Sequence, residues 1–161
     1  MWKTMVNSEG RARVLIPPPL LFFACLGGGI LLEFLFPSCP FSWPWTPRII
    51  AGCILSLISG LLAIGAFIPL LRNKTPFNPS KPTTRIVREG SFRFSRHPMY
   101  LSLVLFLAGV AVLFCSIWLF IMIPILFVAF EIVAVKPEEK YLSEKFGDEY
   151  LDYKASVRRW I

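Results

Sequence analysis

The segment from Pro98 to Phe130 most constrains the fold, because its 33 residues contain no charged side chain. A helix needs about 20 apolar residues to cross the hydrocarbon core of a bilayer. The segment is therefore too long for one ordinary span and short for two full ones. It predicts a tight helical hairpin that turns near Phe114, Cys115 and Ser116.

Two further uncharged runs precede the hairpin. Residues 14–32 carry no charge and are followed by Glu33, and residues 49–71 lie uncharged between Arg48 and Arg72. Hydrophobic residues make up 55% of the chain and charged residues 17%, whereas soluble domains carry about 25% charged residues. We therefore predict an all-α fold, a polytopic membrane helix bundle of about four spans that comprises two N-terminal spans and the hairpin.

The basic residues lie almost entirely on one side of this bundle. Residues 1–13, 72–97 and 136–161 hold sixteen Lys and Arg, whereas the opposite side holds Arg48 alone. Short loops rich in Lys and Arg stay in the cytoplasm. We expect an integral membrane protein, of a bacterial or archaeal inner membrane, with both termini in the cytoplasm. The same asymmetry accounts for the formal charge of +7 without a nucleic-acid partner.

The last segment, from Lys136 onward, has a different composition. Its six basic residues are matched by six acidic ones, and its apolar side chains recur every three or four residues. This spacing is typical of an amphipathic helix, and Gly147 is a natural break in it. Two placements of this cytoplasmic C-terminal helix stay open: on the membrane face, or folded back over the mouth of the bundle.

A polar stretch that contains the single histidine leads into the hairpin. Proline suits the first position of a helix and disfavours helix in the residue before it, so a helix should start at Pro98 with His97 as its cap. The first amides of a helix lack internal partners and attract anions, and Arg93 and Arg96 lie just upstream. Two interpretations stay open: a site for a carboxylate or phosphate, or a membrane-facing segment with arginines on headgroups and Tyr100 at the interface.

Two adjacent glutamates, Glu138 and Glu139, follow the hairpin. Pro137 should restart the helix after the fourth span, and acidic residues in a first helical turn interact favourably with the helix dipole. Alternatively, the two carboxylates accept hydrogen bonds from hydroxyls or from an ammonium group. Because the turn of the hairpin brings its two ends together, we expect His97, Tyr100, Glu138 and Glu139 to line one pocket.

Few other residues suggest chemistry. Glu33 and Glu131 are the charges inside apolar runs, where ionisable residues are functional by default. The alternative is a structural role near water, because Glu33 is expected near the outer end of its span and Glu131 near the cytoplasmic end. The four cysteines form no Cys-x-x-Cys pair and the chain has one histidine, so we expect no metal site. Cys39 and Cys115 are predicted at the outer ends of spans, where a disulfide between them is an open alternative.

Several spaced motifs within residues 81–161 match one family. Arg-His-Pro-Met-Tyr at 96–100 is followed by the apolar hairpin, by Glu-Glu-Lys-Tyr-Leu at 138–142, by Phe-Gly-Asp-Glu-Tyr at 146–150 and by Arg-Trp at 159–160. In this half of its length the chain resembles the isoprenylcysteine carboxyl methyltransferase family, which is related to the membrane phospholipid methyltransferases.

The resemblance implies S-adenosylmethionine as methyl donor, bound on the cytoplasmic side between the hairpin and the tail. It divides the chain into an N-terminal two-span membrane region, residues 1–72, and a cofactor-binding methyltransferase region, residues 73–161. At one matched position, Phe92, a family tyrosine keeps its ring without the hydroxyl. The positions that match cofactor contacts of the family are Thr84, Arg85, Ile86, Val87, Phe92, His97, Pro98, Met99, Tyr100 and Glu138.

Two positions depart from the family's pattern. Ser102 stands where the family has a glycine, and Ala134 stands where the eukaryotic enzymes have a substrate-binding arginine. The cation nearest to Ala134 in sequence is Lys136, which is therefore the candidate substrate contact. A lysine offers a point charge and not the bidentate fork of an arginine.

The expected function is methyl transfer from S-adenosylmethionine, at the cytoplasmic face, to a lipophilic or small acceptor that carries a carboxylate, amine or thiol. For an amine, Glu139 or His97 is the candidate catalytic proton acceptor. A non-catalytic membrane assembly or transport protein and a sterol-reductase-like relative are the alternatives. The sequence leaves open which acceptor is used and whether the chain forms oligomers.

Overall fold

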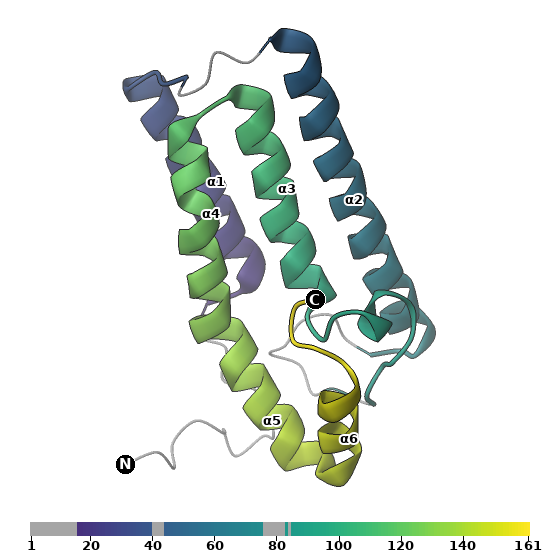
Figure 1. The fold of residues 1–161 in the computed structure, drawn as a ribbon. Coiled ribbons are helices and arrows are strands. Elements are labelled where there is room, and N and C mark those ends of the chain that lie inside the picture. The colour runs from purple at the N-terminus through teal and green to yellow at the C-terminus, as the bar shows by residue number, and fades with distance from the viewer. Residues whose placement is uncertain (1–15, 40–43, 76–82, 84) are drawn as a thin grey trace, which may run out of the picture.

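The fold is a bundle of helices that run alongside one another (Figure 1). The computed structural model describes residues 16–39, 44–75, 83 and 85–161. In this part of the chain no strand is present. The long helices are α1 (Pro18–Leu35), α2 (Trp45–Arg72), α3 (Pro98–Phe114) and α4 (Ile117–Phe130).

Shorter elements gather at one end of the bundle, which we call the inner end (Figure 1). The 3-10 helix η1 (Gly90–Arg93) precedes α3, and the π-helical turn η2 (Glu131–Val135) follows α4. Helices α5 (Lys136–Phe146) and α6 (Asp148–Ser156) complete this end. The opposite end, where α3 turns into α4, is the outer end.

Three of the helices are long and apolar enough to cross a membrane: α1, α2 and the continuous helix from Ile117 to Phe146. Helix α3 is a shorter apolar helix. Large apolar side chains face outward, as shown by Phe34 and Leu57, which are 81% and 63% exposed. Water would make such exposure unfavourable, whereas lipid does not. The predicted helical membrane bundle of about four spans is therefore confirmed, and the chain is an integral membrane protein.

The hairpin turns where the sequence predicts. Helix α3 ends at Phe114, and Cys115 adopts the left-handed conformation with φ 52°. Ser116 then caps α4, because its hydroxyl accepts a hydrogen bond from the Leu119 amide. An N-cap serine satisfies one of the free amides at a helix start.

Small residues let α2 and α3 approach closely. A Cβ atom at Gly52 would lie 3.0 Å from the Gly109 carbonyl oxygen and closer still to the Leu113 side chain. Two helical turns further along, Ser59 donates to the Ser102 carbonyl at 2.7 Å. Glycine and serine at such interfaces allow close backbone packing in lipid.

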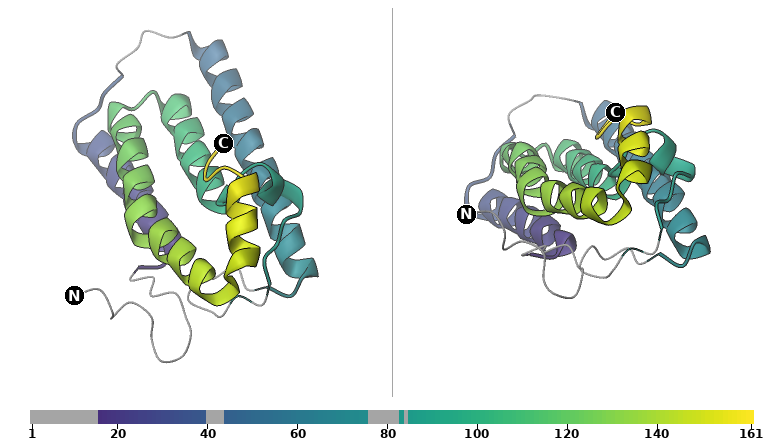
Figure 2. Two further views of the ribbon diagram at one scale, coloured as in Figure 1. Left: turned by 60° about the horizontal axis from the view of Figure 1, so that its bottom comes forward. Right: turned by 90° about the horizontal axis from the view of Figure 1, so that it is seen from below.

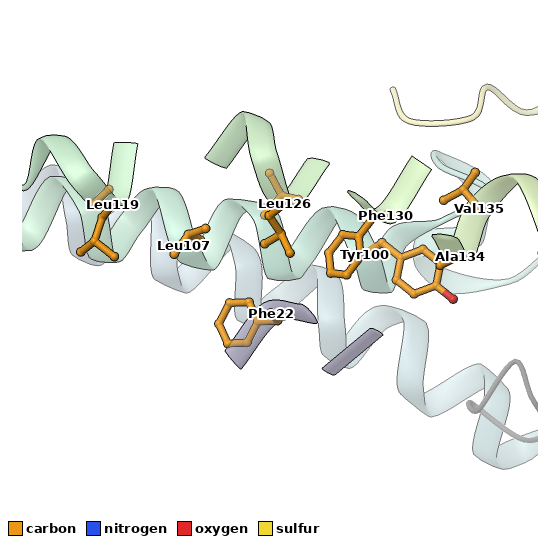
Figure 3. Packing of buried hydrophobic residues seen from close by; sticks show 10 residues of the cluster. Phe22, Tyr100, Leu107, Leu119, Leu126, Phe130, Ala134 and Val135 are labelled. Carbon is orange, nitrogen blue, oxygen red and sulfur yellow. The ribbon is translucent and has the colours of Figure 1, made fainter. Parts of the chain in front are cut away.

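The core runs along α1, α3 and α4 (Figure 3). Phe22 of α1 packs with Leu107 of α3 and with Leu119 and Leu126 of α4, and these four side chains are at most 4% exposed. Toward the inner end the same cluster continues through Phe130. Helix α4 is thus held between α1 and α3, and the inner half of the hairpin is fixed in place.

The expected restart of the helix at Pro137 is wrong, because the helix from Ile117 to Phe146 is continuous. Proline has no amide hydrogen, and its ring clashes with the preceding turn of an α-helix. Here the preceding turn is π-helical, and the Lys136 amide donates to the carbonyl of Glu131, five residues back. The wider π turn leaves room for the ring, so the helix passes through the proline unbroken.

The C-terminal tail folds back over the inner end and does not extend away from it (Figure 2). The break at Gly147 is confirmed, because this residue has φ 53° and separates α5 from α6. Beyond α6, the Arg96 amide donates to the carbonyl of Arg158 at 3.1 Å, and the Ser95 hydroxyl donates to the carbonyl of Arg159 at 3.1 Å. The tail therefore adopts the second of the two placements that the sequence left open, folded back over the mouth of the bundle.

Candidate active site

A cavity of about 440 Å³ lies at the inner end, where α3 begins and α5 passes beside it. Ligand pockets of about 300–1,000 Å³ are typical of small-molecule sites. Its walls come from both ends of the sequence, since α1 and α2 contribute as well as α3, α5 and α6. The division of the chain at residue 72 stays a prediction, but one cavity draws on residues from both sides of it.

Nine of the ten predicted cofactor positions line this cavity. The tenth, Thr84, lies outside the described residues. The nine are Arg85, Ile86, Val87, Phe92, His97, Pro98, Met99, Tyr100 and Glu138.

The two ends of the hairpin meet at Tyr100 and Glu138. The Tyr100 hydroxyl donates to Oε2 of Glu138 at 2.9 Å. The Tyr100 ring is stacked on His97 at 5.7 Å between centroids and packs against Phe130 at 5.3 Å. Tyr100 is on the first turn of α3 and Glu138 on the first turn of α5, so this contact requires the hairpin. The carboxylate and the ring face the same cavity.

His97 lies between the two adjacent glutamates and is 5% exposed. Its Nδ1 is 3.9 Å from Oε2 of Glu138, and its Nε2 is 3.4 Å from Oε1 of Glu139. Its backbone occupies the N-cap position of α3 as predicted, but its side chain makes no capping hydrogen bond. The imidazole is therefore directed at the carboxylates.

Glu139 does not line the cavity, because its buried side chain is held by cations. Arg159 donates from Nε to Oε1 at 3.1 Å and from Nη2 to Oε2 at 2.7 Å, a bidentate fork. Nη1 of Arg96 lies 3.2 Å from Oε1. Arg159 also donates to Glu131 at 2.7 Å, so two arginines balance two glutamates. The hydrogen bond to Glu139 raises the pKa of the Arg159 guanidinium.

The predicted substrate contact Lys136 is exposed and lies outside the residues that line the cavity. Ala134 is fully buried in the hydrophobic core. Ser102 does line the cavity, and its hydroxyl donates to the Met99 carbonyl at 2.7 Å. The serine at the family's glycine position therefore puts a side chain on the cavity wall, with its polar atom already bonded.

Nε of Arg96 and the hydroxyl of Tyr150, both on the cavity wall, are buried and make no well-formed hydrogen bond within the described residues. Burial raises the pKa of the Tyr150 hydroxyl well above its usual range, so this group stays protonated and able to donate. The Arg96 guanidinium lies close enough to the Tyr150 hydroxyl to oppose the rise in its pKa. The hydroxyl of Tyr153 already has a partner, because it donates to the Phe92 carbonyl at 2.8 Å. Unused buried donors are costly, and a ligand acceptor would satisfy them.

Sequence reasoning missed the contributions of the tail and of the first two spans. Arg159 clamps Glu139, and the Trp160 ring lies 6.1 Å from His97 and 4.7 Å from Phe127. The Arg-Trp pair was visible as a motif, but nothing in the sequence specified its partners. Six cavity residues come from α2 and the chain at the start of α1: Pro17, Pro18, Pro19, Ala63, Phe67 and Leu70.

The described residues contain no group of three or more His, Cys, Asp or Glu side chains arranged to hold a metal ion. The cavity offers hydrogen-bonding groups and an apolar wall. Arg85 and Arg96 offer donors to an anion, Glu138 offers an acceptor to hydroxyls or an ammonium, and Phe92 and Leu103 offer apolar surface.

Comparison with known proteins supports one family. The family model described as "Phospholipid methyltransferase" matches residues 47–149, more than half of the chain. The chain is 28% identical over 141 residues to protein-S-isoprenylcysteine O-methyltransferase A of Arabidopsis thaliana, a match that covers 79% of this chain and 66% of that enzyme. It is also 46% identical over 66 residues to a Haemophilus influenzae protein described as uncharacterized, covering 39% of this chain and all of that one. The fold, the cavity and these matches agree: the chain belongs to the phospholipid methyltransferase family of membrane methyltransferases.

Proposed function

We propose that this protein transfers the methyl group of S-adenosylmethionine to a lipophilic or small acceptor at the cytoplasmic face of a membrane, and that the cofactor binds in the inner-end cavity. The contact between Tyr100 and Glu138 carries this proposal, because it joins the two ends of the hairpin on one cavity wall. When bound, S-adenosylmethionine supplies an activated methyl group on a sulfonium, so the protein's main task is alignment in a dry site.

The cavity wall fits the groups of this cofactor. A carboxylate needs donors, and Nε of Arg96 and the Tyr150 hydroxyl are buried there with no well-formed hydrogen bond within the described residues. The amides of Met99 and Tyr100 at the start of α3 add two more. A ribose or an ammonium needs an acceptor, and Glu138 provides one. The Phe92 and Tyr100 rings offer flat surfaces to an adenine or a sulfonium.

The acceptor would approach from the membrane side of the cavity. The cavity wall includes Phe67 and Leu70 of α2, Leu103 of α3 and Pro18 of α1, all uncharged. An apolar chain of a membrane lipid or a small apolar molecule would be compatible with these walls. Ala134 is fully buried in the hydrophobic core and supplies no cation itself, which favours acceptors that need no carboxylate clamp from this residue.

The proton acceptor for an amine substrate is better assigned to His97 than to Glu139. His97 lines the cavity, whereas Glu139 is turned into a cluster with Arg96 and Arg159. Two guanidinium partners stabilise the ionised carboxylate and oppose its protonation. A substrate that is methylated on a carboxylate would need no strong base. Lys136 could bind that carboxylate only if its side chain moved toward the cavity, since it lies outside the lining residues.

The distribution of charge supports the proposed cytoplasmic placement. The described basic residues other than Arg48 lie at or near the inner end, on the loop before α3 and on α5, α6 and the tail. Segments with this excess of Lys and Arg remain on the cytoplasmic side. The cavity, which lies at the same end, would therefore draw its cofactor from the cytoplasm.

Calorimetry on detergent-solubilised protein tests the proposal. We expect binding of S-adenosylmethionine and none of NADPH, which separates a methyltransferase from a reductase-like relative and from a non-catalytic protein. Glu138→Ala should weaken binding about 10- to 100-fold, the loss expected for one hydrogen bond to a charged group. Glu144→Ala, an exposed change on the same helix, is the matched control. Wild-type affinity in Glu138→Ala would contradict the assignment of the cavity.

The acceptor is found by a separate experiment. Membranes that contain the protein are incubated with a methyl-labelled donor and extracted into organic and aqueous phases. Label in the organic phase identifies a lipid acceptor, and label in a small water-soluble product identifies a small one. The same assay on membranes with His97→Ala protein tests the proton acceptor. Loss of label in a variant that still binds the donor indicates that His97 takes part in proton transfer.

A further inference from the structure

The outer end of the bundle brings two cysteines together that are 76 positions apart in the sequence. Cys39 follows α1, and Cys115 forms the turn between α3 and α4. Their Sγ atoms lie 2.9 Å apart. A disulfide bond joins sulfur atoms about 2 Å apart, so a shift of about 1 Å would suffice to form one.

The two segments that carry these cysteines are fixed against each other by hydrogen bonds. Glu33 accepts from the amide and the hydroxyl of Ser38, at 2.7 and 2.8 Å, and also from the hydroxyl of Ser116. The Ile117 amide donates to the Ser38 hydroxyl at 3.2 Å. One carboxylate thus holds the residue before Cys39 and the residue after Cys115.

A second tie lies beside the first. The indole of Trp118 donates to the Phe36 carbonyl at 2.8 Å, and the two rings lie 6.2 Å apart. The approach of the sulfur atoms is therefore part of a built contact between α1 and the turn of the hairpin. Groups held in place in this way react with each other much faster than free groups do.

From this geometry we infer that Cys39 and Cys115 are a redox modification site, which a disulfide-bearing oxidant converts to an intramolecular disulfide. The burial of the two side chains sets the order of events, because Cys39 is exposed and Cys115 is buried. The Cys39 thiolate attacks the oxidant's disulfide, which releases one thiolate and leaves a mixed disulfide on Cys39. The Cys115 thiolate then attacks the Cys39 sulfur and releases the second thiolate. The two protons lost by the cysteines neutralise the two leaving thiolates, and the oxidant gains two electrons.

The compartment supports this chemistry if the inner end is cytoplasmic, as proposed above. The outer end then faces the non-cytoplasmic side, where disulfides form and persist. The cross-link would tie α1 to the hairpin across a long loop, and long loops gain the most from closure. The other two cysteines, Cys25 and Cys53, lie within α1 and α2 and provide an internal control.

Two paired variants test the inference. One keeps only the outer pair (Cys25→Ala with Cys53→Ala), and the other keeps only the span cysteines (Cys39→Ser with Cys115→Ser). Membranes are acid-quenched and denatured, and thiols are labelled with a maleimide polymer before and after reduction. We expect the first variant to take no label before reduction and two after it, on a monomer-sized band. The second should take two labels in both conditions.

Addition of oxidised glutathione to the reduced, solubilised protein separates geometry from orientation. If the proposed orientation fails but the geometry is right, the outer-pair variant is isolated reduced and loses both reactive thiols after treatment. A glutathione adduct that persists on Cys39, a cross-link between two chains, or two reactive thiols after treatment would each overturn the inference. The disulfide should also raise the melting temperature of the outer-pair variant by several degrees, and reductant should remove this gain.

Discussion

The two ends of the α3–α4 hairpin both depend on a carboxylate, which is buried at the inner end and half-buried at the outer end, and the partners of the two differ. At the inner end, Glu139 is held by the cations Arg96 and Arg159. At the outer end, Glu33 accepts hydrogen bonds from uncharged donors of Ser38 and Ser116. Both arrangements join segments far apart in the sequence, and both lie beside a turn of the same hairpin.

The α3–α4 hairpin is therefore held by ion pairs at its inner end and by hydrogen bonds from uncharged donors at its outer end. Removal of one member of a buried ion pair leaves an uncompensated charge, whereas removal of the Glu33 carboxylate leaves only uncharged donors without their acceptor. The inner end, beside the proposed cofactor cavity, should therefore be the more sensitive of the two. The contacts at the outer end should be replaceable without loss of the inner-end cavity.

The largest effect is expected for Glu139→Ala. The change leaves Arg96, whose side chain is 7% exposed, without its anion. Breaking a buried pair in this way costs about 3–5 kcal/mol of the free energy of unfolding. Thermal unfolding in detergent measures it, with Glu144→Ala on the same helix as control. Equal stability of the two variants would contradict a charged inner clamp.

A smaller effect is expected at the outer end for Glu33→Ala. The three hydroxyl and amide donors of Ser38 and Ser116 lose their acceptor, so the free energy of unfolding should fall by less than in Glu139→Ala. Cofactor affinity should not change, because the inner cavity contains no residue of this contact. Calorimetry and unfolding on the same sample compare the two quantities. A drop in affinity without a drop in stability would show that the two ends are not independent.

Removal of Arg159 should cost less than removal of its partner. In Arg159→Ala, Glu139 keeps Arg96, and the lost side chain is a third exposed, so the expected loss is about 1 kcal/mol. The local effect should be larger, because Arg159 fixes the tail. Hydrogen exchange should rise over residues 148–161, while Arg158→Ala, which alters an exposed side chain, should leave exchange unchanged.

The sequence was sufficient to predict what depends on charge and periodicity. Charge-free runs located the spans, and the break at Cys115 and Ser116 followed from the length of the last run. The meeting of Tyr100 with Glu138 followed from the same hairpin, since its turn returns the chain to the starting side. These features need only the width of a bilayer and the geometry of a helix.

Features that depend on a choice of partner were not predictable. Pro137 was expected to restart a helix, but the π turn before it removes the clash, and no local signal marks such a turn. Glu139 was expected on the cavity with Glu138, yet neighbouring residues on a helix point about 100° apart and Arg159 draws one of them away. Apolar spans look alike in sequence, so the contribution of Phe67 to the cavity was missed.

The smallest expected effect is a loss of stability at high pH, caused by deprotonation of Tyr153 at the inner end. Burial raises the pKa of the Tyr153 hydroxyl from 10.0 to about 12, despite the opposing charges of Arg96 and Arg88. Because the folded pKa is the higher one, the stabilisation by this group is complete below pH 10 and is lost as the pH rises through about 12. Deprotonation also ends its donation to the Phe92 carbonyl. Thermal unfolding below pH 10 and near pH 12 should therefore show a larger drop for the wild type than for Tyr153→Phe. Equal drops in the melting temperature of the wild type and Tyr153→Phe would mean that Tyr153 is not the alkali-sensitive contact of the inner end.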